Sequence, residues 1–325
     1  MRKLFTLALF AAVTSLHVSA QQDAQFTQNM YNKLTVNPGY AGSSNAICAT
    51  LLGRQQWTGF TGAPQKFLLN FDAPVKMLHG GAGLVVMQDQ LGFEKTFIAQ
   101  GIYSYRMPVG PGELGIGVGL GILNKSINGN WVAIDDYTLD PKIPNNGIST
   151  MTFDVNLGVY YNIADQLYFG LSTTHLPASD LKKSAGSGSL PNNTGNAYEL
   201  NYSLARHYYI MAGYNYRLGD SPLELRPSVF VKTETSSTQL DLNCNLMYNK
   251  MVWGGLSYRL SDAAAILLGF QKDIGNGVAR IGYSYDITTS ALRKHSSGSH
   301  EIMVGYCFKL ASPSKVERHG NVRFL

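Results

Sequence analysis

The residue types that form a nucleophile and its base lie close together near the C-terminus. Residues 295–300 read His-Ser-Ser-Gly-Ser-His. A serine hydrolase needs a serine, a histidine and an orienting polar group within hydrogen-bond reach of one another. The chain has no Gly-x-Ser-x-Gly string, and this segment is rich in serine and glycine, so a flexible loop is the simpler interpretation. The sequence predicts no catalytic residue and no enzyme.

Two further segments were candidates for ligand chemistry. Residues 124–150 contain the oxygen-bearing side chains Asp135, Asp136, Asp140 and Asn145, but they lack the order and the closing glutamate of a calcium loop. Residues 114–122 alternate an aliphatic residue with glycine. This period of two differs from the G-x-G-x-x-G spacing of a dinucleotide loop, and it favours backbone packed closely inside the fold.

The cysteines and the charges exclude other classes of site. Cys48, Cys244 and Cys307 are far apart, and their odd number does not suit a disulfide framework, so we interpret them as ordinary strand residues. Lysine and arginine are scattered, and removal of Arg2 and Lys3 with the predicted signal peptide lowers the formal charge from +5 to +3. The sequence therefore predicts no metal, no cofactor and no nucleic-acid partner.

The elements that position these residues are strands with two different faces. In residues 151–161, Met151, Phe153 and Val155 begin an apolar face, whereas Asp154 and Asn156 belong to the opposite face. Fourteen such segments can be traced, and a count of 12 to 16 is allowed. They lie near 46–56, 64–72, 80–88, 95–106, 113–123, 151–161, 166–174, 199–216, 222–232, 238–248, 251–260, 263–271, 277–286 and 300–310.

These strand lengths favour a membrane. A tilted transmembrane strand needs about 9–11 residues, and tyrosine is the leading aromatic residue, with 19 copies, as expected at the interfaces of a lipid-embedded barrel. The fold class we predict is all-β, a transmembrane antiparallel β-barrel of the outer membrane, in contact with its lipid. The chain is divided into a signal peptide at 1–20 cleaved near Ala20, a periplasmic or plug segment at 21–45, the barrel at 46–310 and a periplasmic tail at 311–325.

The connections fit an outer-membrane orientation. Short turns at 107–112, 162–165, 218–221 and 249–250 are expected inside, and long loops at 124–150, 173–198 and 287–299 outside. Charged residues on the polar faces are expected to pair across the lumen, because a charge facing lipid at mid-depth costs about 2–4 kcal/mol. These residues are Asp154, Glu224, Arg226, Lys232, Asp241 and Arg280.

Short strings are spread along nearly the whole chain. They are Gln-Phe-Thr-Gln-Asn-Met-Tyr-Asn at 25–32, Val-Asn-Pro-Gly-Tyr-Ala-Gly at 36–42, Gly-Arg-Gln-Gln-Trp at 53–57, Gly-Ala-Pro at 62–64, Asp-Pro-Lys-Ile-Pro at 140–144, His-Leu-Pro at 175–177, Tyr-Ser-Tyr-Asp at 283–286 and His-Glu-Ile-Met at 300–303. Together they resemble the PorP/SprF membrane proteins of the Bacteroidota type IX secretion system. The resemblance gives these candidate partner-binding residues: Phe26, Gln28, Asn37, Pro38, Tyr40, Ala41, Gly42, Arg54, Gln56, Trp57, Gly62, Pro64, Asp140, Pro144, His175, Pro177, Tyr283, Asp286, His300 and Glu301.

The resemblance implies a non-enzymatic component that supports export or surface attachment of cargo with C-terminal sorting domains, including adhesins in gliding bacteria. Its implied partners are the periplasmic ring and peptidoglycan-tethering proteins of the machine, and the sorting domain of the cargo. For Arg54 and Trp57 a structural role and partner binding both remain open. The alternative function is transport of small hydrophobic or polar solutes, with residues 21–45 as a hatch.

Overall fold

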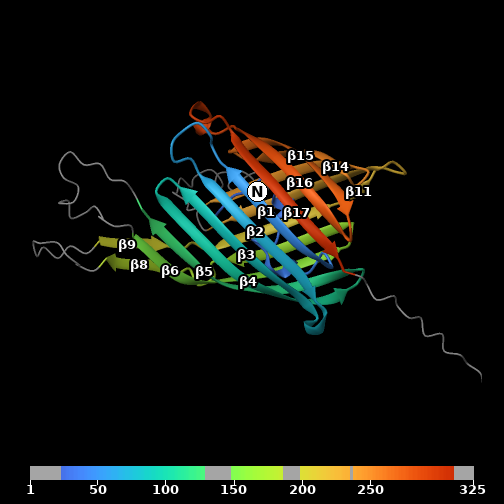
Figure 1. The fold of residues 1–325 in the computed structure, drawn as a ribbon, viewed down its shortest axis with the longest axis horizontal. Helices are drawn as coiled ribbons and strands as arrows, with labels where there is room; N and C mark the ends of the chain where they lie inside the picture. The colour runs from blue at the N-terminus through green and yellow to red at the C-terminus, as the bar shows by residue number, and fades with distance from the viewer. Residues whose placement is uncertain (1–22, 129–147, 186–197, 235–236, 311–325) are drawn as a thin grey trace, which may run out of the picture.

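The structure is a computed structural model that describes residues 23–128, 148–185, 198–234 and 237–310 (Figure 1). Its strands are β1 (Ala46–Gln55), β2 (Gln65–Val75), β3 (Gly80–Leu91), β4 (Glu94–Val109), β5 (Gly112–Ile127), β6 (Ile148–Ile163), β7 (Leu167–Thr174), β8 (Asp180–Ala185), β9 (Tyr198–Ser203), β10 (His207–Tyr214), β11 (Tyr216–Arg217), β12 (Leu223–Thr233), β13 (Thr238–Tyr248), β14 (Val252–Arg259), β15 (Ala263–Ile274), β16 (Gly277–Thr288) and β17 (Ser299–Lys309). Short 3-10 turns are η1 (Asn29–Tyr31), η2 (Pro38–Tyr40), η3 (Lys76–Leu78) and η5 (Ala291–Lys294). No helix among the described residues is long and apolar enough to cross a membrane.

The main sheet closes on itself. Each strand pairs antiparallel with its neighbour, β10 pairs with both β7 and β12, and the first strand β1 pairs with the last strand β17 from Ala46↔Lys309 to Gln55↔His300. Fourteen strands of the described chain form this ring, and β11 pairs only with β12 beside it. The predicted barrel and its strand count are confirmed.

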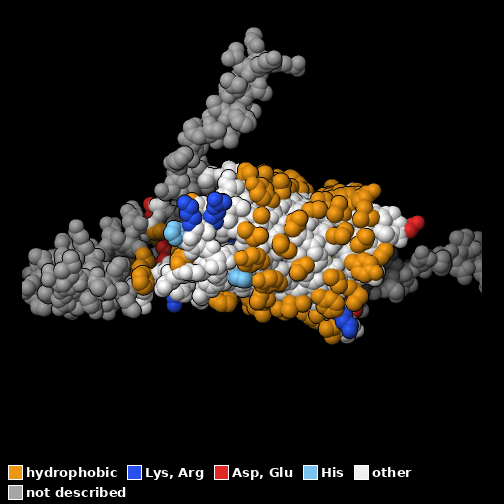
Figure 2. Space-filling model, turned by 90° about the horizontal axis from the view of Figure 1, so that it is seen from above, with side chains coloured by type: hydrophobic (Ala, Val, Ile, Leu, Met, Phe, Trp, Pro, Cys, Tyr) orange, Lys and Arg blue, Asp and Glu red, His pale blue; other side chains and the backbone are white. Residues whose placement is uncertain are grey.

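The alternation of side chains places an apolar surface outside and a polar lumen inside. In β6, Met151 and Phe153 are 63% and 56% exposed, while Asp154 and Asn156 are buried. Figure 2 shows hydrophobic side chains spread over the visible wall of the barrel, with the few lysine and arginine side chains toward its ends. Because charges are absent from the middle of that wall and present in the lumen, the barrel suits a lipid surround.

The two ends of the barrel differ. At one end, called here the short-turn end, residues 76–79, 110–111, 249–251 and 275–276 join strands, and the start of β1 and the end of β17 also lie there. At the other end, called here the long-loop end, the connections include 128–147, 175–206 and 289–298. This arrangement agrees with the expected division between short and long connections.

One predicted strand and one predicted loop were wrong. The run 199–216 is not a single strand, because β9 pairs with β8 outside the ring and only β10 and β11 belong to the wall. Consequently β8 lies within the expected loop 173–198. Alternation continues through both β9 and β10, so periodicity alone did not reveal that residues 204–206 interrupt the pairing.

Residues 23–45, called here the leader, lie inside the ring. Phe26, Leu34 and Ala41 are buried against inward side chains of the wall such as Leu52 and Trp253. Gly117 on the inner face of β5 packs against the backbone of Pro38 and Gly39, leaving no room for a side chain there. The alternating glycines therefore allow the close backbone approach that was predicted.

Candidate functional site

A buried charge network near the long-loop end holds the leader. Arg54 of β1 forms ion pairs with Asp286 of β16 (2.7 Å) and Glu301 of β17 (3.1 Å). Arg259 of β14 adds a second guanidinium 3.1 Å from Asp286. These four side chains come from the neighbourhood where the ring closes, and all are at most 3% exposed. Buried charges are tolerated only when each is paired and hydrogen-bonded, and here the wall supplies both signs.

The leader completes this network through its backbone. The N–H groups of Thr27 and Gln28 donate to the two oxygens of Glu301, each at 2.8 Å. The Thr27 hydroxyl donates to Asp286 (2.8 Å) and accepts from Arg54 (2.9 Å). Without these donors from the leader, the buried carboxylates of Asp286 and Glu301 would lose hydrogen bonds, and an unsatisfied buried carboxylate is costly. The leader is therefore part of the bonding of the wall and not a loosely enclosed segment.

The middle of the leader makes a second set of contacts. The Lys33 ammonium lies 3.4 Å from the centroid of the Tyr168 ring and donates to the Tyr160 hydroxyl at 3.3 Å. A cation over an aromatic face is favourable, more so where water is excluded. Tyr31 packs against Trp253, with ring centroids 5.2 Å apart. These contacts join the leader to β6, β7 and β14.

The end of the leader is fixed at the short-turn end. Asn37 donates to the carbonyl oxygen of Val159 (3.0 Å), and its own side-chain oxygen accepts from Gly39 N–H (2.9 Å). Gly42 N–H donates to Asp72 of β2 (3.1 Å). The family-motif residues therefore hold the end of the leader against the wall: Asn37 through its side-chain amide, Gly42 through its backbone N–H, and Pro38 through the packing of its backbone against Gly117.

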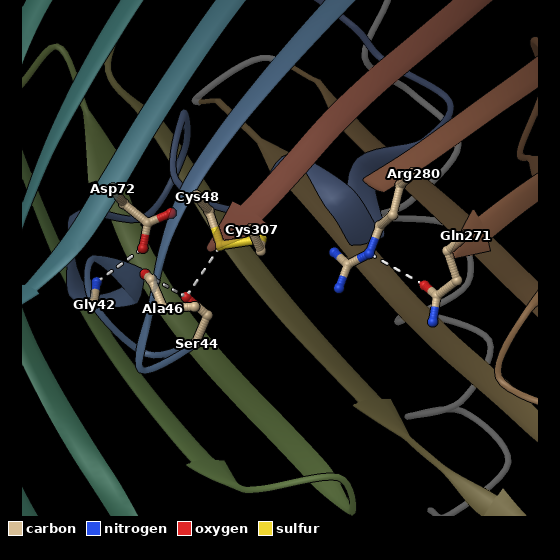
Figure 3. The surroundings of a disulfide bond; sticks show 8 residues. All are labelled: Gly42, Ser44, Ala46, Cys48, Asp72, Gln271, Arg280 and Cys307. Atoms are coloured by element: carbon tan, nitrogen blue, oxygen red, sulfur yellow. Dashed lines mark hydrogen bonds between the residues drawn. A yellow bond between two sulfur atoms is a disulfide. The ribbon is translucent and has the colours of Figure 1, made fainter. Parts of the chain in front are cut away.

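A disulfide lies beside this end, and it corrects the interpretation of the cysteines. Cys48 of β1 and Cys307 of β17 are register partners and are joined by a disulfide across the seam between first and last strand. Figure 3 shows it next to the contacts of Gly42 and Ser44. Cys244 is free and exposed on the outer face, as expected of an ordinary strand residue. A disulfide agrees with an oxidising compartment outside the cytoplasm.

At the long-loop end, the start of the described leader meets two histidines. His175, which follows β7, has Nε2 2.9 Å from Asp23 Oδ1 and Nδ1 3.0 Å from Asp154 Oδ1. His207, the first residue of β10, lies 3.6 Å from Asp23 Oδ2. Burial opposes the charge of His175, but the Asp23 carboxylate and the hydrogen bond with Asp154 raise the pKa of His175 to about 10. Burial likewise opposes ionisation of Asp23, yet the two histidines hold its pKa well below the usual value.

A cavity of about 700 Å³ opens above this cluster. Gln56, Trp57 and Pro64 of the first hairpin line it, together with Asp23 and His175. Trp57 has a positive φ of 50°, and its backbone N–H donates to the Ser299 hydroxyl (3.0 Å). The cavity is where candidate residues Gln56, Trp57, Pro64 and His175 meet, at the long-loop end of the lumen.

Other candidate residues lie apart from these contacts. Tyr283 and His300 face outward and share a hydrogen bond of 2.7 Å, and Gly62 has φ +82° in the β1–β2 connection. Pro177 follows His175 in the β7–β8 connection. Asp140 and Pro144 lie outside the described residues, as do the other acidic residues of the 124–150 segment, the predicted signal peptide at 1–20 and the predicted tail at 311–325.

The expected lumen charges pair locally and not across the lumen. Glu224 pairs with Arg226 on the same strand (2.7 Å), and Asp241 pairs with Arg259 on the next strand (3.4 Å). Arg280 donates to Gln271 (3.1 Å, Figure 3). Lys232 donates to the Asp23 carbonyl oxygen (3.2 Å). The leader occupies the lumen, so charges reach neighbouring strands or the leader before they reach the far wall.

Sequence reasoning missed Asp23, Thr27, His207 and Arg259. Arg259 could have been predicted to face the lumen, because the alternation of the 251–260 strand places its side chain on the face opposite to that of Tyr258 and Leu260. Asp23 and His207 are 184 residues apart, and no local pattern brings them together.

A closed antiparallel ring with an apolar wall and a polar, filled lumen defines an integral β-barrel protein of the outer membrane. A family profile described as "type IX secretion system membrane protein PorP/SprF" matches residues 18–306. The chain therefore belongs to the PorP/SprF family. It is an outer-membrane component of the secretion system, and it acts together with other components of that machine.

Solved structures share the fold. The CymD monoaromatic hydrocarbon channel has a TM-score of 0.52 at 11% identity, covering 88% of this chain and 94% of that chain. The toluene transporter TodX of P. putida has a TM-score of 0.48 at 11% identity, covering 87% and 95%. No curated protein sequence matched the chain significantly. The structural likeness shows the outer-membrane barrel fold alone.

Proposed function

We propose that this barrel supports the export or surface attachment of cargo with C-terminal sorting domains, including adhesins in gliding bacteria. The observation that carries the proposal is the bonding of the leader inside the lumen. Thr27 and Gln28 satisfy a buried carboxylate of the wall, and Pro38 and Gly39 pack against glycine backbone. A lumen filled by the chain's own leader leaves the two ends of the barrel as the surfaces that meet partners.

The short-turn end is the surface we assign to the periplasmic machine. Its η3 turn carries Met77 and Leu78, which are 92% and 58% exposed. The turn is held in place, since the Leu78 carbonyl oxygen accepts from the Tyr103 hydroxyl (2.7 Å) and the His79 carbonyl oxygen accepts from Arg106 N–H (2.9 Å). A fixed turn that presents apolar side chains to water suits docking of a periplasmic ring or peptidoglycan-tethering protein. We assign the tail at 311–325 to the same surface.

The cavity at the long-loop end is the surface we assign to the cargo. Gln56, Trp57 and Pro64 line it, and these belong to the family strings of the first hairpin. A pocket that combines an indole ring with amide and charged groups suits a polypeptide segment.

Complementation of a deletion strain tests these assignments. Wild type, Met77→Asp and a chain lacking residues 311–325 are compared with Leu256→Ala, a lipid-facing control whose parent side chain is 65% exposed. Met77→Asp and the truncation are expected to lower cargo in the medium while the amount of folded barrel stays constant. Full export by both variants would remove these two surfaces from the docking proposal.

The rival function is passage of small hydrophobic or polar solutes with the leader as a hatch. The cavity of about 700 Å³ is the feature that favours it. Planar-bilayer recordings of the full chain separate the two functions. The export proposal expects closed traces, whereas steady conductance or saturable solute uptake would favour the transporter.

A further inference from the structure

Three metal-ligating side chains from distant parts of the chain converge at the long-loop end of the lumen. Asp23, His175 and His207 each offer one ligand atom, and these atoms all lie within 4.8 Å of one another. They come from the leader, from the residue after β7 and from the first residue of β10. Both histidines are buried, and their rings are nearly perpendicular, at 77°. The two imidazoles therefore approach the Asp23 carboxylate from different directions.

Surrounding groups fix the orientation of these side chains. Asp154, which is 1% exposed, lies 3.0 Å from His175 Nδ1, so its carboxylate favours a proton on that nitrogen and leaves Nε2 facing Asp23. The Tyr209 hydroxyl donates to Asp23 Oδ2 at 2.6 Å, and the Thr174 hydroxyl donates to the same oxygen at 3.1 Å. A carboxylate behind a histidine is the usual outer shell of a metal site, because it fixes the tautomer and raises the basicity of the ligating nitrogen.

The backbone at His175 is also held in an unusual conformation. Its φ is +56°, in the left-handed region that non-glycine residues rarely adopt. The His175 N–H donates to the Asn156 side-chain oxygen at 3.0 Å, and this contact helps to hold the residue there. Such conformations persist where the surroundings enforce them, and they occur preferentially at functional sites.

If His175 carried a single proton, on the Nδ1 that faces Asp154, two lone pairs would face each other in this arrangement. With Asp154 bound to the Nδ1 proton, a neutral His175 directs its Nε2 lone pair at Asp23 Oδ1, only 2.9 Å away. Either a second proton on His175 or a cation between the two atoms is required. In the metal-free site the second proton on His175 forms the ion pair with Asp23. A metal ion that replaces this proton is also within reach of His207, whose Nδ1 lies 3.6 Å from Asp23 Oδ2 and 3.1 Å from the Ala205 carbonyl oxygen.

We propose that Asp23, His175 and His207 form a binding site for a divalent transition metal of the zinc type, which ties the leader to the wall. Two imidazole nitrogens and one carboxylate oxygen are a frequent ligand set for zinc. Tetrahedral zinc with bonds of the usual length separates its ligand atoms by about 3.3 Å. His175 Nε2 lies 2.9 Å from Asp23 Oδ1, His207 Nδ1 lies 3.6 Å from Asp23 Oδ2, and one ligand atom of each residue lies within 4.8 Å of the others, so small shifts bring the three atoms to that separation. The adjacent cavity, which Asp23 and His175 line, gives the ion a path and a water for the fourth position.

The test measures zinc bound to the full-length purified protein in detergent. After treatment with EDTA and dialysis against zinc chloride, we expect about one zinc per chain by mass spectrometry of the metal. His175→Ala and His207→Ala should each weaken zinc binding at least tenfold, as measured against a zinc-binding dye. Asp154→Asn should weaken it about 10- to 100-fold. His300→Ala, which removes a histidine on the outer face, is the control and should retain the zinc.

X-ray absorption of the zinc-loaded wild type keeps the proposal testable if a variant does not fold. Two imidazoles and oxygen ligands around zinc are expected. No bound zinc, a shell with fewer than two imidazoles, or equal binding by wild type and a folded His175→Ala/His207→Ala variant would each overturn the proposal.

Discussion

The contact most informative about the leader is the Thr27 hydroxyl. Thr27→Val keeps the shape of the side chain but removes one hydrogen bond donated to Asp286 and those accepted from Arg54 and Arg259. A hydrogen bond to a charged group contributes about 1.5–3 kcal/mol. The two arginines keep their carboxylate partners in the variant, so we expect a loss of about 2 kcal/mol in the free energy of leader docking, not the sum of three bonds. That loss corresponds to about a 30-fold rise in the undocked population.

Hydrogen exchange read by mass spectrometry measures this population, because amides of a docked segment exchange through local opening. The Thr27 and Gln28 amides, which donate to Glu301, are expected to exchange about 30-fold faster in Thr27→Val, while peptides from β5 are unchanged.

Thr35→Val is the matched control in the same segment. Its hydroxyl donates only to the neutral side chains Asn32 and Asn70, so its loss is expected to cost about 1 kcal/mol and to speed exchange about fivefold. Equal effects of the two substitutions, or no effect of Thr27→Val, would refute the view that the charged network anchors the leader.

Three other predictions concern the wall. The double substitution Cys48→Ser/Cys307→Ser removes the seam disulfide and should lower the thermal unfolding temperature, since a disulfide stabilises by about 2–4 kcal/mol. The control Cys244→Ser should leave that temperature unchanged, and a non-reduced peptide map of the wild type should contain the linked pair. Gly117→Ala places a methyl group against the Pro38 backbone and should speed proteolysis of the leader, whereas Gly101→Ala, whose added methyl group would lie 3.9 Å from Leu120 oxygen, should not. Leu256→Arg directs a charge to lipid and should reduce the folded, heat-modifiable fraction on gels, because such a charge costs about 2–4 kcal/mol at mid-depth, while Leu256→Ala folds normally.

The wall of the barrel was predictable because its signal is local. Met151 and Phe153 face lipid while Asp154 and Asn156 face the lumen, and this two-residue period can be read without knowing any partner strand. The glycines of residues 114–122 likewise predicted that backbone packs closely against this strand, although only the structure shows that the backbone is that of Pro38 and Gly39.

Contacts that depend on register were not predictable in the same way. Cys48 and Cys307 are 259 residues apart and meet only because the closed ring sets β1 against β17 in one register. Arg54 was an inward residue of the predicted first strand, yet its pairing with Asp286 and Glu301 requires the order of strands around the seam. The contact between Asp23 and His175 was the least predictable, because it depends on the path that the leader takes through the lumen.

The alternation of residues 199–216 shows a different limit. Both β9 and β10 alternate, but β9 pairs with β8 beyond the wall. Periodicity reports that a strand has two faces, and it does not report which neighbour supplies the hydrogen bonds.

Quantitative proteomics of the cell surface and medium, after deletion of the gene and after complementation with wild type, tests the central claim most directly. The account predicts selective loss of proteins that carry C-terminal sorting domains, restored by the wild-type chain. An unchanged surface proteome would contradict the export role and would transfer the function to solute passage through the barrel.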